Sequence, residues 1–297
     1  MKTQPILSIV LILRNPGDEI DGVCTSLVGD AHKEEIEIII VDGRPEPKEG
    51  LPSYDDITVL SAPGLNMPHL KAFGAAQSHA RSIAFLEPKG VPTATWLTTI
   101  LHELHDHTEA ALTGPVFYEG SSSAFDRAAF LFEYGAFARD YGFEGEAPEL
   151  AGNNMALPSS LLFTTCGDFI KKNGLNKPFV QQRLQNGGMP IRFAQGMAIN
   201  LRTNHSAGEF LKTRFHYARC FGGMRCAQAT TIKAWVYRIG TPVIPLLVMY
   251  KAFQRATANP LLDVASFLWL AGISFAWSLG EAVGYWSGSG KSCERLY

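Results

Sequence analysis

Short apolar segments alternate with segments of helical periodicity through the first 110 residues of the chain. The apolar runs, which are typical of buried strands, cover residues 6–13, 37–41, 57–61 and 82–86. Helical spacing of apolar residues predicts helices over residues 16–28, 68–79 and 93–107. Strands separated by helices of about ten to fifteen residues favour right-handed crossovers and a mostly parallel sheet. The pattern therefore predicts an α/β, doubly wound domain of a nucleotide-binding type.

This alternation becomes less regular after residue 110. Residues 111–118 predict a strand, residues 121–141 a helix with aromatic residues on one face, and residues 143–151 a loop rich in Glu, Gly and Pro. Two further helices, one from Ser159 and one around residues 179–185, precede a strand near residues 191–194. We therefore assign residues 1–205 to one domain.

Residues 206–297 have a different character. Residues 210–221 form a basic helix in this interpretation, and such a helix could lie against anionic lipid headgroups. Two apolar runs follow, residues 235–250 and 264–279. Each has about 16 residues, fewer than the roughly 20 that a straight membrane span needs. An interfacial or re-entrant hairpin, tilted spans and a pair of buried core helices all remain open, and we expect membrane attachment.

Composition narrows the classes of partner. The chain has 297 residues, 46% of them hydrophobic, and a formal charge of −2, which gives no indication of a nucleic-acid partner. Its five cysteines are odd in number, scattered and without a CxxC pair. This usage favours a reduced, cytosolic compartment.

Candidate chemistry gathers where the predicted strands end. Glu87 and Lys89 follow the fourth strand, Asp42 ends the second, and Asn15 follows the first. Open α/β sheets bind ligands at the carboxyl ends of their strands. A carboxylate, which only accepts hydrogen bonds, suits an imide N–H or the hydroxyls of a ribose. Asp42 could instead cap the turn before Gly43, and Asn15 could cap a helix, so both alternatives stay open.

The order of several short motifs resembles glycosyltransferase family 2, whose members have the GT-A fold. The motifs are, in chain order, Asn15, Val41-Asp42-Gly43, Gly74-Ala75-Ala76, Arg81 before IAFLE, Gly114-Pro115-Val116, GNNMA from Gly152, and Arg183-Leu184. The resemblance covers roughly residues 6–205, and it rests on the order of the motifs more than on any one of them. Members transfer a sugar from a nucleotide diphosphate sugar, usually with inversion.

Site roles follow from this resemblance residue by residue. It implies that the donor lies against Asn15, Asp42, Arg81, Glu87 and Lys89. It also implies that Asn153 and Asn154 lie in a loop that faces the acceptor. For the two asparagines, an ordinary turn is the alternative.

The chain departs from the family pattern at the metal site. Family members usually have aspartates at the positions of Glu87 and Lys89, and these hold the Mg²⁺ or Mn²⁺ that bridges the donor phosphates. Hard cations need oxygen ligands, and Glu87 alone makes a poor site. We hypothesise that the Lys89 ammonium takes the place of the metal; a solvated lysine in a turn is the alternative.

A second departure concerns the catalytic base. The family usually supplies an acidic pair at the positions of Asn176 and Lys177, and neither residue can take a proton from an acceptor hydroxyl at neutral pH. Substitute carboxylates nearby in the sequence are Asp168, Glu146 and Glu149. Each of the three is also explained as an ordinary surface carboxylate.

Taken with the apolar C-terminal segment, the resemblance implies a membrane-associated transferase with a cytoplasmic catalytic domain. It would move a sugar from a nucleotide sugar to a lipid-linked or polysaccharide acceptor in cell-envelope or exopolysaccharide synthesis. Loss of both acidic motifs favours a different class, a catalytically silent scaffold that binds a partner transferase or a glycan. A soluble nucleotide-binding protein is a third alternative, and it requires the apolar C-terminus to pack onto the domain.

Overall fold

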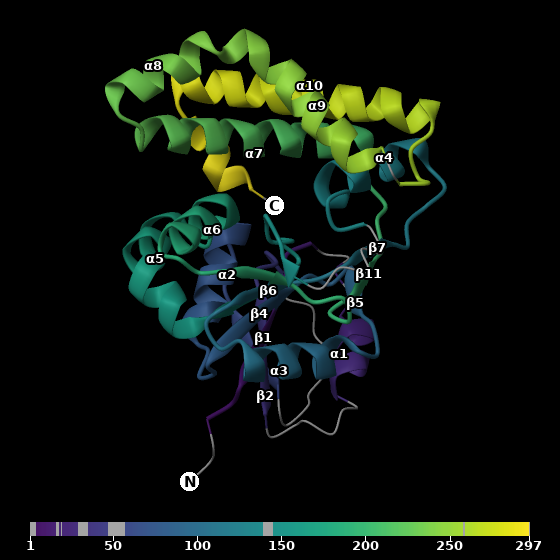
Figure 1. Ribbon diagram of the computed structural model, residues 1–297, viewed down its shortest axis with the longest axis vertical. Coiled ribbons are helices and arrows are strands. Elements are labelled where there is room, and N and C mark those ends of the chain that lie inside the picture. Colours follow the sequence, from purple (N-terminus) through teal and green to yellow (C-terminus); the bar gives the residue numbers. More distant parts are fainter. Residues whose placement is uncertain are drawn as a thin grey trace. The chain divides into compact units, whose positions relative to one another are not determined.

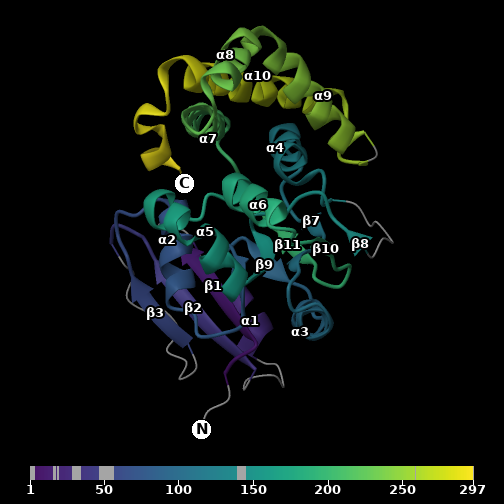
Figure 2. The same cartoon turned by 60° about the vertical axis from the view of Figure 1, so that its left-hand side comes forward.

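The computed structural model describes residues 4–15, 18, 20–28, 35–46, 57–138, 145–257 and 259–296. The chain divides into two compact units, which we call the sheet unit (residues 1–117 and 140–202) and the helical unit (residues 118–139 and 203–297). Figures 1 and 2 show the elements of both units. The helical unit includes residues 118–139, which the sequence pattern places in the first domain.

An eight-stranded sheet with the order β3-β2-β1-β4-β9-β6-β10-β8 forms the centre of the sheet unit. Its strands are β1 (Leu7–Leu13), β2 (Ile36–Asp42), β3 (Ile57–Ser61), β4 (Ser82–Leu86), β6 (Ala111–Thr113), β8 (Gly145–Glu146), β9 (Asn154–Pro158) and β10 (Ile191–Phe193). The first four strands in the order are parallel to one another, as are β6 and β10, whereas β9 is antiparallel to β4 and β6. The predicted α/β class with a mostly parallel sheet is confirmed.

Apolar residues of the strands explain this architecture. Every residue of β1 and β4 is buried, as expected for central parallel strands covered on both faces. One core cluster joins β1, β2 and β4 to three helices, α2 (Met67–Ala76), α5 (Ser159–Asn173) and α6 (Lys177–Asn186). Helices α1 (Asp21–Val28) and α3 (Trp96–Asp106) complete the sheet unit.

Three of the predicted boundaries differ in the structure, two of them next to a second, three-stranded sheet. It has the order β5-β11-β7, with β5 (Gly90–Pro92), β11 (Ile199–Leu201) and β7 (Val116–Tyr118). Because β5 pairs with β11, the helix predicted from residue 93 begins only at Trp96. The strand predicted over residues 111–118 is split at Gly114-Pro115, and the helix predicted over 121–141 is α4 (Ala124–Tyr134). The first residues of the helix predicted from residue 16 lie outside the described residues.

Helix α2 approaches the sheet through Gly74, which yields a prediction about stability. A Cβ at this position would lie 2.5 Å from Cγ1 of Val10 and 2.8 Å from Cγ2 of Val41. Both neighbours are fully buried in the core cluster. We expect Gly74→Ala to lower the free energy of unfolding by about 1–3 kcal/mol through overpacking. Urea denaturation measures this, with Gly167→Ala on α5 as control, because a Cβ at Gly167 meets nothing within 4 Å.

The helical unit consists of α4 with the C-terminal helices. These are α7 (Ala207–Ala227), α8 (Thr231–Ile239), the 3₁₀ turn η1 (Thr241–Val243), α9 (Ile244–Ala256), α10 (Val264–Ser287) and the 3₁₀ turn η2 (Gly290–Arg295). Among the described residues, α10 is the one unbroken helix long and apolar enough to cross a membrane. Helix α8 and the segment from Thr241 to Ala256 pass the same test only together, and they are bent by 48° at their junction.

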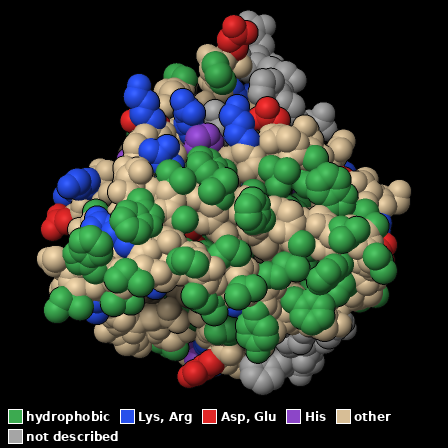
Figure 3. Space-filling model, turned by 90° about the horizontal axis from the view of Figure 1, so that it is seen from above, with side chains coloured by type: hydrophobic (Ala, Val, Ile, Leu, Met, Phe, Trp, Pro, Cys, Tyr) green, Lys and Arg blue, Asp and Glu red, His purple; other side chains and the backbone are tan. Residues whose placement is uncertain are grey.

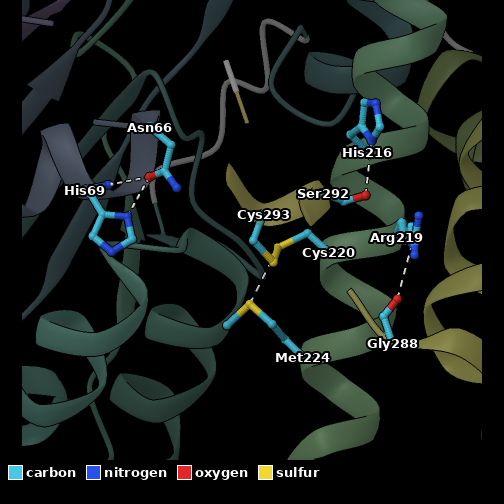
Figure 4. Close-up of a disulfide and its surroundings, with 9 residues drawn as sticks. All are labelled: Asn66, His69, His216, Arg219, Cys220, Met224, Gly288, Ser292 and Cys293. Carbon is cyan, nitrogen blue, oxygen red and sulfur yellow. Dashed lines mark hydrogen bonds between the residues drawn. A yellow bond between two sulfur atoms is a disulfide. The ribbon is translucent and has the colours of Figure 1, made fainter. Parts of the chain in front are cut away.

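A disulfide links Cys220 of α7 to Cys293 of η2, 73 residues later in the chain (Figure 4). Hydrogen bonds beside it also attach the chain's C-terminal turn to α7. Nδ1 of His216 lies 3.0 Å from Oγ of Ser292, and Nε of Arg219 donates to the Gly288 carbonyl over 3.2 Å. The expectation that the cysteines are unpaired is therefore wrong for this pair. Its spacing gave no sign of pairing, because packing of α10 on α7 brings η2 back to Cys220.

Candidate functional site

Asp42 and Glu87 lie at one edge of the large sheet, on either side of β1. In the strand register, Asp42 of β2 pairs with Leu13 of β1, and Leu86 of β4 pairs with Leu11. Since these three strands are parallel, their carboxyl ends meet at this edge, where α/β folds bind ligands. The structure thus brings Asp42 and Glu87, two of the five residues predicted to bind the donor, to the edge where Asn15 and Lys89 also follow their strands.

The carboxylate of Asp42 is hydrogen-bonded to Arg44, two residues further along the chain. Its Oδ1 accepts from Nε of Arg44 over 2.9 Å and its Oδ2 from the terminal nitrogen over 2.7 Å. The backbone N–H of Arg44 also donates to Oδ1, over 3.1 Å, which gives the turn-capping geometry left open above. Both side chains are buried. Burial opposes ionisation of Asp42, but the hydrogen bonds and charge of Arg44 outweigh it and hold the pKa of Asp42 below its ordinary value.

Lys71 of α2 lies next to Glu87, although the sequence pattern did not identify it as a site residue. Its Nζ lies 3.2 Å from Oε1 of Glu87 and donates to the Gly152 carbonyl over 2.7 Å. The Lys71 side chain is 9% exposed and that of Glu87 is 30% exposed. A nearly buried ammonium is therefore paired with a partly open carboxylate at this edge of the sheet.

Lys89 lies on the solvent side of the same turn. Its side chain is exposed, and its carbonyl accepts from the N–H of Arg202 over 2.9 Å, which fixes the backbone of the turn next to β5. Two lysines are therefore associated with this turn: the nearly buried Lys71, which reaches Glu87 from α2, and the exposed Lys89 of the turn itself.

Asn153 has an unusual environment next to Glu87. The pairing of Leu86 with Asn154 places Asn153 at the edge where β4 ends. Asn153 is fully buried, yet within the described part of the chain neither Oδ1 nor Nδ2 has a hydrogen-bond partner. An unpaired buried amide costs about 1–3 kcal/mol, so this group is suited to meet a ligand or an ordered water.

The side chain of Asn154, which is predicted to face the acceptor, is hydrogen-bonded within the protein. Its Oδ1 accepts from Nε1 of Trp96 over 2.9 Å, and its Nδ2 donates to the carbonyls of Met197 and Pro115 over 2.8 and 3.2 Å. The fully buried amide uses both donors within the protein. Asn154 therefore holds β9 to its neighbours and is a structural residue.

Asn15 and Arg81, which are also predicted to contact the donor, lie at opposite edges of the sheet. Asn15 follows β1 at the correct edge, but its Nδ2 donates to Oδ1 of Asp18 over 3.2 Å. Arg81 precedes β4, and its backbone N–H donates to the carbonyl of Pro5. It lies at the amino end of the strand, opposite Glu87, so the structure does not bring Arg81 to the site.

The three candidate bases lie on different elements of the sheet unit. Asp168 is exposed on α5. Glu146 lies in β8, four strands beyond β4 in the sheet order, which corresponds to about 19 Å at the usual strand spacing. Glu149 pairs with Lys177 over 3.7 Å and precedes Asn153 in the same loop. Glu149 is thus the one that the chain connects most directly to the Glu87 edge.

A divalent metal does not fit the residues at this edge. Among the described residues, no three His, Cys, Asp or Glu side chains come together as a possible metal site. The one carboxylate that follows β4 is already paired with the Lys71 ammonium, which would repel a cation.

Comparison with known proteins identifies the fold. No protein-family model matches the sequence, and no curated protein matches it. Many solved structures resemble the chain, and they include the following two. The mannosyltransferase PcManGT from Pyrobaculum calidifontis, in complex with GDP-Man and Mn²⁺, has a TM-score of 0.60 at 12% identity, over 95% of this chain and 87% of its own.

The second structure is GalNAc-T7 with UDP, GalNAc and Mn²⁺. Its TM-score is 0.53 at 11% identity, over 68% of this chain, which spans only 44% of the GalNAc-T7 chain. Identities this low concern architecture alone. The mixed sheet, its flanking helices and these two likenesses show that the chain has the GT-A fold of glycosyltransferases.

Proposed function

We propose that the protein is a glycosyltransferase that takes its sugar from a nucleotide diphosphate sugar. The observation that carries this proposal is the group formed by Lys71, Glu87 and the unpaired amide of Asn153 at the carboxyl edge of a GT-A sheet. A buried ammonium beside hydrogen-bonding groups suits an anionic diphosphate attached to a sugar. Both similar structures contain a nucleotide or nucleotide sugar, which supports the same class of donor.

In the proposed site, fixed positive charge of the chain stabilises the leaving diphosphate. Lys71 is held by Glu87 and the Gly152 carbonyl, so its ammonium needs little reorganisation when charge develops on the phosphate oxygens. Lys89, which is exposed, would approach from the solvent side. This arrangement assigns to two lysines the role that a metal has in many relatives.

The nucleoside is proposed to lie near Asp42 and Arg44. Since both carboxylate oxygens of Asp42 accept from Arg44, the pair acts as one rigid unit with the guanidinium held in place. The inverting family 2 chemistry and a uridine diphosphate sugar are proposed from the motif order alone. Among the candidate bases, Glu149 is the first to test, because its loop leads to Asn153.

For the acceptor we propose a lipid-linked or polysaccharide glycan of the cell envelope. The helical unit supports a membrane location, because α10 is long and apolar enough to span and further apolar side chains are exposed on α8 and α9. The sheet unit would face the cytoplasm. The Cys220–Cys293 disulfide is rare chemistry for a reducing cytosol. Alkylation in intact cells tests the location. If Cys220 and Cys293 stay disulfide-bonded there and do not react, the cytoplasmic location is contradicted.

The rival function is a catalytically silent scaffold for a partner transferase or a glycan. It is favoured by the lack of an acidic pair at Asn176-Lys177. Incubating the detergent-solubilised full chain with radiolabelled nucleotide sugars and a membrane-lipid extract separates the two. The enzyme proposal expects release of the nucleotide diphosphate and label in the lipid or glycan fraction. Binding of a nucleotide without either product would support the scaffold.

A further inference from the structure

The helical unit exposes one broad apolar face. The exposed apolar positions recur at helical spacing in each of three helices: Ile232, Trp235, Val236 and Ile239 in α8; Leu246, Leu247, Tyr250 and Phe253 in α9; Val264, Leu268, Phe275, Leu279 and Trp286 in α10. Their exposed fractions reach 79% at Ile232, 72% at Leu246 and 80% at Val264. Figure 3 shows hydrophobic side chains gathered across this face, with Lys and Arg concentrated toward one margin. An apolar face of this extent requires a partner.

The opposite side of α10 is tightly joined to α7. Both Figure 1 and Figure 2 show α7 and α4 beneath α10 within the helical unit. A Cβ at Gly280 would lie 2.3 Å from the Phe215 carbonyl oxygen, and one at Gly284 would lie 2.5 Å from that of Arg219. The two helix backbones therefore touch over several turns. The Cys220–Cys293 disulfide also links α7 covalently to η2, the turn that follows α10. If α10 moves into a membrane, α7 has to move with it.

Charges on α7 and α4 decide how α10 can meet a membrane. Helix α7 carries Lys212, Arg214, Arg219 and Arg225, and Arg214 forms an ion pair with Glu133 of α4. If α10 crossed a bilayer, these charges would enter the hydrocarbon beside it, which is costly. If α10 lies flat, its apolar stripe meets lipid while α7 and α4 remain in water. The 24 residues of α10 suffice for a span, but in a span the charged helix α7 packed against it would have to enter the bilayer as well.

Charge and aromatic content point to an anionic lipid surface as the occupant of the face. Residues 203–297 contain ten Lys or Arg and four Asp or Glu, although the whole chain has a formal charge of −2. Trp235, Trp269 and Trp286 are 50%, 41% and 56% exposed. Tryptophan prefers the headgroup level of a bilayer, and basic residues near an apolar helix face favour anionic headgroups.

We infer that α8, α9 and α10 form a monotopic membrane-docking face, with α10 parallel to the bilayer plane and none of these three helices crossing it. The inference extends the membrane location included in the proposed function. It places a lipid-linked acceptor and the enzyme on the same leaflet without a span formed by these helices.

Vesicle sedimentation of the full chain tests the docking face. We expect binding to vesicles of phosphatidylglycerol and phosphatidylcholine, and weaker binding to phosphatidylcholine alone. Leu246→Asp should weaken binding about tenfold or more, because it places a charge within the apolar face. The matched control is Val59→Asp on β3, an apolar residue that is 44% exposed in the sheet unit, and it should bind as the wild type does. Unchanged vesicle binding of the Leu246 variant would overturn the inference. A stable dimer that does not bind vesicles would also overturn it, because a second copy of the chain would then cover the face.

Labelling distinguishes the flat from the spanning arrangement. Thr257, between α9 and α10, and Ser287, the last residue of α10, are exposed positions on either side of α10. With Thr257→Cys and Ser287→Cys on sealed vesicles, we expect a membrane-impermeant maleimide to label both sites as fully as after lysis. Protection of either site until lysis would show a span and contradict the inference. Nucleotide binding measured on the same samples keeps the two proposals separate, since it depends on the sheet unit alone.

Discussion

Lys71→Met is expected to lower kcat for sugar transfer by about 100- to 1000-fold, the usual effect of removing one preorganised charge from a site where negative charge develops. Lys71 is nearly buried and held at 3.2 Å from Glu87 and 2.7 Å from the Gly152 carbonyl, so no other described side chain replaces it there. Product nucleotide release from detergent-solubilised protein measures the effect. Lys172→Met, an exposed lysine in the last turn of α5, is the control and should keep full activity.

A second variant separates charge from structure. Lys71→Met also leaves Glu87 without its partner, which destabilises the protein by itself. The pair Lys71→Met with Glu87→Gln removes that unpaired charge and should recover stability. If Lys71 acts on the diphosphate, kcat of the double variant stays low. Recovery of kcat together with stability would show that Lys71 has only a structural role.

Arg44→Met is expected to cost about 3–5 kcal/mol of stability at pH 7, because it leaves the Asp42 carboxylate buried and unpaired. Both side chains of the pair are almost completely inaccessible, so water cannot replace the lost hydrogen bonds. Arg44→Met combined with Asp42→Asn should recover most of the loss. Urea denaturation of the full chain measures both variants, and a loss below 1 kcal/mol for the single variant would show that the pair is not buried as described.

The same variant should change the pH dependence of stability. In the wild type the folded-state pKa of Asp42 is lowered, so its contribution is present above the unfolded pKa and is lost as the pH falls through the folded value. In Arg44→Met, burial without a partner raises the pKa, and protonation on acidification relieves the penalty. We therefore expect the stability difference between wild type and variant to shrink from pH 7 to about pH 4. A constant difference would contradict this assignment.

The strands and their common edge were predictable because buried parallel strands are continuous apolar runs. The bounds of the buried strand β4 coincide with its predicted run, as do those of β3, an edge strand without a buried residue, and Asp42 and Glu87 lie where the runs place them. Lys71 was not recognised, since its partners are 16 and 81 residues away. One signal was present: Leu70, Lys71, Gly74 and Ala75 recur at helical spacing and form the buried face of α2. A lysine on an apolar helix face needs a partner.

Other features depend on contacts that no local pattern encodes. The amide of Asn154 is used by Trp96 and two carbonyls from distant segments, whereas the neighbouring amide of Asn153 is unpaired. In sequence the two asparagines are equivalent. The Cys220–Cys293 disulfide likewise depends on glycine contacts between α7 and α10. Position within the assembled fold, more than residue type, decides these roles.

The most direct test of a donor site built on lysines is calorimetric titration of the detergent-solubilised full chain with UDP and GDP. Each titration is made with Mg²⁺ or Mn²⁺ and repeated with excess chelator. We predict that one of the nucleotides binds with the same affinity under both conditions, and that Lys71→Met weakens this binding about 10- to 100-fold, as expected for loss of a charge-assisted contact. Binding that disappears with chelator, or the absence of binding under every condition, would contradict the account.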